Sequence, residues 1–143
     1  MKIRIDKVIR RMGLGFRKVY SLVLTDRALY IIQTGSAGTL KHYWFDERLN
    51  RAVTEQLDRR DVKQLETQEA RLDSIPLDEL AHESNNFLVR LEAIEDVLVR
   101  PTRWPEMIVK VTGSDHRFVF PLLPLDQVQA FANALNKWNK KPK

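Results

Sequence analysis

The stretch YSLVLTDRALYII, residues 20–32, decides how this chain begins to fold. Two runs rich in β-branched, aromatic and leucine residues, 20–24 and 29–32, stand on either side of the short link TDRA. Residues of these types favour extended strands, and a short link between two such runs predicts a β-hairpin. We expect Asp26 to bond backbone N–H groups in the turn. The hairpin predicts an antiparallel sheet.

The residues after this hairpin change from strand-like to helical patterning. We expect 33–38 to form a loop and 40–45 to add a short strand. From Asp46 apolar residues recur about every 3.6 positions, which predicts helices with a bend at 57–64. Pro76 ends this pattern, and residues 77–80 are expected to form one more helical turn. The segment 46–83 is acidic, and we expect its charged side chains to face solvent. The apolar stripe consists of Leu49, Val53, Leu57, Val62, Leu65 and Leu72.

Strand patterns resume after Asn86 and end in one helix. We expect strands at 87–90, 97–100, 107–111 and 117–120, with a hairpin turn at 112–115. The sequence LEAIED, 91–96, is expected to form one helical turn that places Ile94 in the core. Pro124 suits the first turn of the last helix. Its apolar face is Val128, Phe131, Ala132, Leu135 and Trp138.

This order of elements predicts an α+β fold. Consecutive short strands with segregated helices favour a curved antiparallel sheet or partly open barrel, capped by the C-terminal helix. We expect the 143 residues to form a single domain, with a helical insertion at about 46–80 that reaches residue 83 at most and a basic tail at 139–143. The βαβ alternation of a nucleotide-binding parallel sheet is absent from the pattern.

Three segments in this order resemble the pleckstrin-homology-like (PH-like) fold, in particular its bacterial PH-like and GRAM group. They are LVLTDRALYII at 22–32, LDEL with NNFLVRLEAIEDV at 77–97, and HRFVFPLLPLDQVQAFANALNKW at 116–138. The resemblance covers residues 20–138 and implies a barrel-like sheet closed at one end by the helix. It also implies contact with a membrane or a protein rather than catalysis. Phosphoinositide-binding members carry spaced cations on their first hairpin, and the spacing here departs from that pattern.

The stretch RRMGLGFRK, 10–18, is the main candidate for a binding site. The first 18 residues hold seven cations and one carboxylate, Asp6. Apolar Leu14 and Phe16 between cation pairs suit a loop that enters an anionic lipid headgroup layer. The alternative is one strand whose Met12, Leu14 and Phe16 face the core. The residues of the candidate anionic-surface site are Lys7, Arg10, Arg11, Leu14, Phe16, Arg17 and Lys18.

A second candidate patch combines Arg100, Arg103 and Trp104 between two prolines. A tryptophan beside cations suits stacking on a base or a place at a membrane interface. The alternative is that Trp104 packs over the rim of its own domain.

Signatures of catalysis are missing from the sequence. Gly13 and Gly15 lack the third glycine of a dinucleotide-binding loop, because Lys18 holds its place. Neither a P-loop nor a nucleophile elbow occurs. The chain has no cysteine, and its three histidines, His42, His82 and His116, are scattered. We therefore expect no enzyme activity, no cofactor and no metal.

The function that fits these patterns is a non-enzymatic PH-like module that docks to anionic membrane lipid or to a protein partner. The alternative is self-assembly into a homo-oligomer through Leu49, Val53 and Leu57 of the helical insertion. Nucleic-acid binding is the weaker third reading, since the chain has positive charge and no recognised motif. Without an apolar run long enough to span a bilayer, we expect a cytoplasmic protein that reaches the membrane only peripherally.

Overall fold

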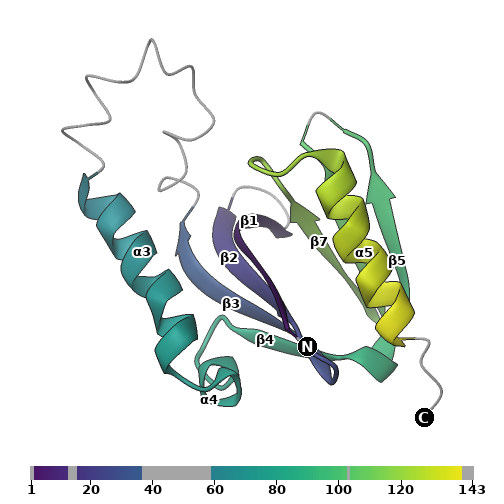
Figure 1. The fold of residues 1–143 in the computed structure, drawn as a ribbon, viewed down its shortest axis with the longest axis horizontal. Helices are drawn as coiled ribbons and strands as arrows, with labels where there is room; N and C mark the ends of the chain where they lie inside the picture. The colour runs from purple at the N-terminus through teal and green to yellow at the C-terminus, as the bar shows by residue number, and fades with distance from the viewer. Residues whose placement is uncertain (1, 13–15, 37–58, 103, 140–143) are drawn as a thin grey trace.

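The computed structural model describes residues 2–12, 16–36, 59–102 and 104–139. Figure 1 shows a sheet with α3 on one side and α5 on the other. The elements in chain order are β1 (Ile3–Met12), β2 (Phe16–Leu24), β3 (Ala28–Ser36), α3 (Arg59–Ser74), α4 (Leu77–Ala81), β4 (Phe87–Arg90), the 3-10 turn η2 (Leu91–Ala93), β5 (Ile94–Arg100), β6 (Glu106–Val111), β7 (Ser114–Val119) and α5 (Leu125–Asn139).

The seven strands form one sheet in the order β4-β3-β2-β1-β7-β6-β5, and all neighbouring strands are antiparallel. The sheet is not closed, because β4 and β5 remain its two edges in the described part of the chain. The predicted α+β fold, with an antiparallel sheet, helices between two of its strands and a C-terminal helix, is confirmed at this level.

The hairpin predicted from residues 20–32 is confirmed as β2 and β3, with Leu24 opposite Leu29. The turn is held by Thr25 in place of the expected Asp26: its hydroxyl oxygen accepts from the amides of Arg27 and Ala28, each at 3.2 Å. The expected loop at 33–38 was wrong for residues 33–36, since β3 continues to Ser36. Pairing with β2, which places Gly35 opposite Val19, overrides the loop-like composition.

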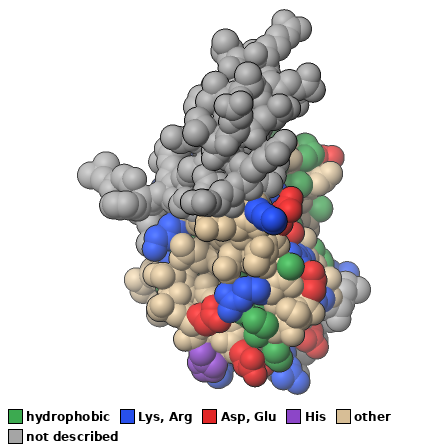
Figure 2. Space-filling view, turned by 90° about the vertical axis from the view of Figure 1, so that its left-hand side faces the viewer, with side chains coloured by type: hydrophobic (Ala, Val, Ile, Leu, Met, Phe, Trp, Pro, Cys, Tyr) green, Lys and Arg blue, Asp and Glu red, His purple; other side chains and the backbone are tan. Residues whose placement is uncertain are grey.

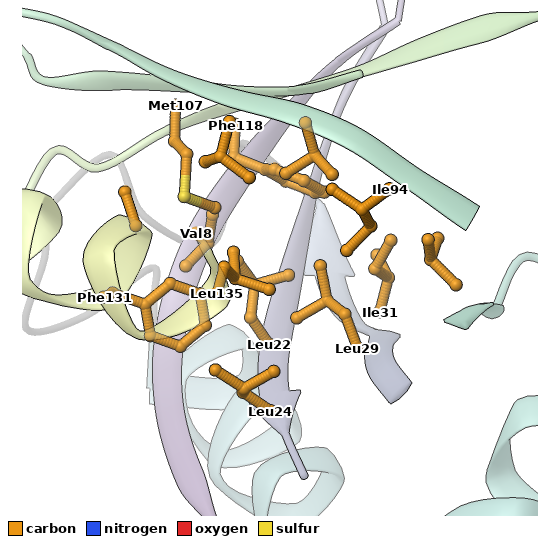
Figure 3. Close-up of a cluster of buried hydrophobic side chains, with 14 of the residues drawn as sticks. Val8, Leu22, Leu24, Leu29, Ile31, Ile94, Met107, Phe118, Phe131 and Leu135 are labelled. Carbon is orange, nitrogen blue, oxygen red and sulfur yellow. The ribbon is translucent and has the colours of Figure 1, made fainter. Parts of the chain in front are cut away.

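Side chains of the sheet alternate between an inner face, which packs against α5, and an outer face, which packs against α3 and α4. Figure 3 shows part of the inner core, where side chains from the sheet and from α5 point toward one another. Burial of this set is the main stabilising contribution of the fold. Its labelled members are Val8, Leu22, Leu24, Leu29, Ile31, Ile94, Met107, Phe118, Phe131 and Leu135.

The helices between β3 and β4 cover the outer face. Leu65 and Leu72 of α3 and Leu80 of α4 are buried, as the helical period predicted for the first two. The hydroxyl of Tyr30 on β3 donates to Asp78 of α4 at 2.7 Å. Burial, followed by this hydrogen bond, raises the pKa of Tyr30 to about 12. The expected strand at 40–45 and the helical positions Leu49, Val53 and Leu57 lie outside the described residues.

The second half of the sheet matches the predicted strands, with differences in where β5 and β7 begin. The strand at 87–90 and the burial of Ile94 are confirmed. The helical turn expected at 91–96 forms only at Leu91–Ala93, and residues 94–96 already belong to β5. The turn before β7 is shorter than expected: Val111 pairs with Ser114, and Gly113 has a φ of 84°. Only glycine adopts this backbone without strain. His116 therefore lies within β7.

The C-terminal helix and its apolar face are confirmed, with Pro124 one residue before the helix rather than in its first turn. The carbonyl of Pro124 accepts from the amides of Gln127 and Val128, which places Pro124 just before the first turn of α5. Val128, Phe131, Ala132 and Leu135 are buried, and Trp138 packs against the same inner core. α5 lies against β5 (Figure 1) and closes the apolar interior on this side.

Candidate functional site

A β-bulge in β1 decides where the N-terminal cations lie. Asp6 and Lys7 together occupy the space opposite Ser21, between the pairs Ile5 with Leu22 and Val8 with Tyr20. Lys7 takes a φ of 59°, in the left-handed region that costs a non-glycine residue about 1 kcal/mol or more. Strict alternation would point Lys7 toward the inner core, and the bulge keeps it out. Lys7 thus reaches the outer face.

Two of the N-terminal cations bind α3. The ammonium of Lys7 lies 3.1 Å from both carboxylate oxygens of Glu69. Arg4 donates to Asp6 at 2.8 Å, to Asp73 at 2.9 Å and to the backbone carbonyl of Glu69 at 2.7 Å. Burial alone would lower the pKa of Arg4, but Asp6, Asp73 and Glu69 raise it above its ordinary value. These cations fasten β1 to α3.

Glu69 departs from the solvated surface that its acidic segment predicts, because it is only 8% exposed. Burial raises the pKa of its carboxyl group, while the hydrogen bond and charge of Lys7 lower it in part. A buried carboxylate requires such a partner. Lys7, a predicted member of the anionic-surface site, is therefore placed in a structural ion pair.

The guanidinium of Arg10 lies on the inner face beyond the bulge, among aromatic rings. It sits 4.0 Å from the ring centre of Phe87 and 6.0 Å from that of Tyr20. Its Nη2 atom donates to Nδ1 of His116 at 3.1 Å. The His116 ring stacks on Phe118, with ring centres 6.4 Å apart and planes 8° apart. We call Arg10, Tyr20, Phe87 and His116 the Arg10 cluster.

His116 is held in its neutral form within this cluster. Burial lowers the pKa of His116, Arg10 lowers it further, and Asp115 partly opposes them. An arginine only donates hydrogen bonds, so Nδ1 acts as the acceptor and the ring proton belongs on Nε2. The histidine thereby orients Arg10 without adding a second positive charge.

The backbone brings the predicted cation pairs together across the first hairpin. β1 and β2 pair Arg10 with Lys18, Arg11 with Arg17 and Met12 with Phe16. Arg10 and Lys18 are both half-buried. The interpretation of RRMGLGFRK as one alternating strand was wrong, because its two halves belong to two antiparallel strands. Leu14 lies outside the described residues, so its predicted role stays a prediction.

The second candidate patch is joined to a buried carboxylate. Nη1 of Arg100 lies 3.6 Å from Oε1 of Glu106, a side chain that is 3% exposed. The backbone carbonyl of Trp104 accepts from the hydroxyl of Thr102 at 2.6 Å. Trp104 itself is half-buried, and Arg103 lies outside the described residues. The described contacts of this patch, Arg100 with Glu106 and Thr102 with Trp104, therefore lie within the link between β5 and β6 and at its two ends.

The sequence did not single out Phe87 and His116 as partners of Arg10. The three residues come from β4, β7 and β1, which are far apart in the sequence, and only the folded sheet brings their side chains together. A periodic pattern reports a face of one element and not which other element lies opposite. The composition therefore carried no signal for this contact.

Comparison with protein-family models finds no match, and comparison with curated protein sequences finds none either. Among the described residues, no group of three or more histidine or acidic side chains is arranged to hold a metal ion. None of the helices in the described ranges combines the length and apolarity needed to cross a membrane. The functional argument therefore rests on the geometry of the first hairpin.

Proposed function

We propose that this chain is a non-enzymatic binding module with a PH-like architecture, and that it docks to anionic membrane lipid through the β1–β2 hairpin. The order of the seven strands, the terminal helix and the placement of the helices between β3 and β4 support the PH-like assignment. The observation that carries the function is the cross-strand pairing of Arg10 with Lys18 and of Arg11 with Arg17.

The cations of this hairpin have no acidic residue near them in the sequence. Between Asp6 and Asp26 the chain contains no carboxylate side chain. Each basic side chain near an anionic leaflet contributes about 1 kcal/mol, so four give about 4 kcal/mol, which corresponds to an approximately millimolar complex. The module would therefore bind weakly and reversibly, and added salt would release it.

Lipid is a better fit to this hairpin than nucleic acid. In the sequence, apolar Met12, Leu14 and Phe16 are interspersed with the cations of residues 10–18, and such residues suit an interfacial layer of lipid. Readout of a base would need polar side chains that match its edges, and single-strand binding would need a stacking platform. The positive charge alone supports only sequence-independent contact with nucleic acid.

Sedimentation with phosphatidylcholine vesicles, with and without phosphatidylserine, tests this proposal. The full chain is expected to sediment with the anionic vesicles only. Lys18→Gln should weaken that binding about fivefold, the equivalent of about 1 kcal/mol. Arg27→Gln is the matched control, because Arg27 is an exposed cation at the other end of the β2 strand and should change binding less than about twofold.

Two outcomes would overturn the lipid proposal. The first is equal and negligible binding to both kinds of vesicle. The second is tighter binding to a single-stranded oligonucleotide than to anionic vesicles in the same buffer, which would assign the hairpin to nucleic acid instead.

A further inference from the structure

A groove separates the N-terminal half of β1 from α5, far along β1 from the charged hairpin end. Its volume is about 450 Å³, within the range of binding clefts in proteins. The β1 wall is formed by Ile3, Arg4, Ile5 and Asp6. The opposite wall is formed by Leu122, Leu123, Gln127, Ala130 and Phe131.

The groove exists because β1 and β7 separate. In the described part of the chain, β7 pairs with β1 only at Ile9 and Arg10. The chain after β7 then leaves the sheet, since the amide of Phe120 donates to the carbonyl of Pro105 and α5 begins at Leu125. Residues Ile3 to Ile5 pair with β2 on their other side. Their β7 side is thus a strand edge that faces the groove.

Arg4 and Asp6 show that this wall is made of backbone. Both residues line the groove, yet their side chains form hydrogen bonds on the outer face. Arg4 donates to Asp73 and to the backbone carbonyl of Glu69, and Asp6 accepts from the hydroxyl of Ser21. The two residues therefore present mainly main-chain atoms to the groove. Ile3 and Ile5 are only partly buried against the inner core.

The α5 side of the groove exposes apolar side chains. Leu122, which lines the groove, is 40% exposed, and Leu125, which begins α5 and does not line the groove, is 41% exposed. Large apolar side chains left open beside a cleft mark interaction sites more often than single surface leucines do. The groove thus combines a hydrogen-bonding edge on one wall with an apolar surface on the other.

We propose that this groove binds an extended peptide segment of a partner protein, which adds as a strand to β1 and places apolar side chains against α5. Main-chain hydrogen bonds to an open edge require an extended polypeptide, and alternate side chains of that strand fall on the apolar wall. An acyl chain or small apolar molecule would leave the edge of β1 without hydrogen bonds. The four lining residues Ile3 to Asp6 span about 13 Å, enough for a peptide strand of similar length.

This site is independent of the hairpin proposed to bind lipid. The groove uses the backbone of β1 before the bulge, while lipid binding uses the side chains of Arg10 and Lys18 beyond it. Failure of one proposal leaves the other standing.

Selection from a phage library of random dodecapeptides on the immobilised full chain tests the groove. Selected peptides should carry apolar residues at alternate positions. Ala130→Trp fills the groove from an exposed position on α5 and should weaken their binding by about tenfold. Gln129→Trp places the same side chain on an exposed position of α5 that does not line the groove, and should change binding less than about twofold.

A second readout identifies strand addition. Bound peptide should slow hydrogen exchange of β1 backbone amides within residues 3–7, measured by NMR, and both tryptophan variants should keep the thermal unfolding midpoint of the parent chain. Four outcomes would overturn the proposal: no selected peptide, equal weakening by both variants, binding without slowed exchange in residues 3–7, or a homodimer that Ala130→Trp abolishes, which would make a second copy the occupant.

Discussion

The two halves of β1 hold their cations in different surroundings. Before the bulge, Arg4 and Lys7 reach carboxylates and a carbonyl of α3 and fasten the strand to that helix. Beyond the bulge, Arg10 lies against Phe87 and pairs across the hairpin with Lys18. The positive charge counted along the sequence is therefore larger than the positive charge available to a ligand. One extra residue in the strand separates the two roles.

Removal of Glu69 tests the first half of this comparison and should have the largest effect. Glu69→Ala leaves the Lys7 ammonium half-buried without its carboxylate, so the free energy of unfolding should fall by about 3 kcal/mol. Urea denaturation measures this loss. The double variant Lys7→Met, Glu69→Leu should recover most of it, because an apolar pair avoids the cost of burying charge. If Glu69→Ala costs no more than Lys18→Ala, the ion pair does not hold β1 to α3.

Two arginines on the same strand sharpen the comparison. Arg4→Ala removes charge-assisted hydrogen bonds to Asp6, Asp73 and the Glu69 carbonyl, and should lower the free energy of unfolding by about 2 kcal/mol. Arg10→Ala removes the contact with the Phe87 ring and the hydrogen bond to Nδ1 of His116, for about 1 kcal/mol. Chemical denaturation of both variants under the same conditions gives the order. The reverse order would mean that the Arg10 cluster, and not the α3 contact, anchors β1.

The titration of His116 should appear in the pH dependence of the free energy of unfolding, with a smaller effect than the substitutions above. The pKa of His116 is lower in the folded protein than its ordinary value of 6.5, so the unfolded chain takes up the proton first as the pH falls. The stability contribution is therefore present above 6.5 and is lost as the pH drops through the folded pKa. His116→Gln keeps an acceptor for Arg10 and cannot titrate, so it should flatten this part of the stability profile. Identical profiles for the two proteins would show that His116 is not held neutral by the cluster.

Local features of the fold could be predicted from the sequence, and pairings between distant strands could not. The hairpin at 20–32 and the helix α5 follow from short-range patterns whose apolar faces are complete in themselves. Residues 33–36 and 114–115 are strands because neighbouring strands supply hydrogen bonds to a loop-like composition.

The candidate site divides in the same way. The cations of the first hairpin were visible in the sequence, but their pairing across β1 and β2 was not predicted. The sequence could not predict that Lys7 lies outside the candidate anionic-surface site. Lys7 has a positive φ in the β1 bulge, and no local sequence pattern marks a lysine for that conformation. The burial of Glu69 was not predictable either, because it depends on how α3 packs across β1.

Matched lysine variants on the two sides of the bulge test whether only the cations beyond the bulge bind lipid. The measurement is the partitioning of the folded protein between buffer and phosphatidylserine-containing vesicles. Lys7→Gln and Lys18→Gln remove the same charge from the same hairpin. We expect Lys18→Gln to weaken partitioning about fivefold, and Lys7→Gln, which removes a charge already paired with Glu69, to change it less than about twofold. Equal losses for the two variants, or the larger loss for Lys7→Gln, would contradict this expectation.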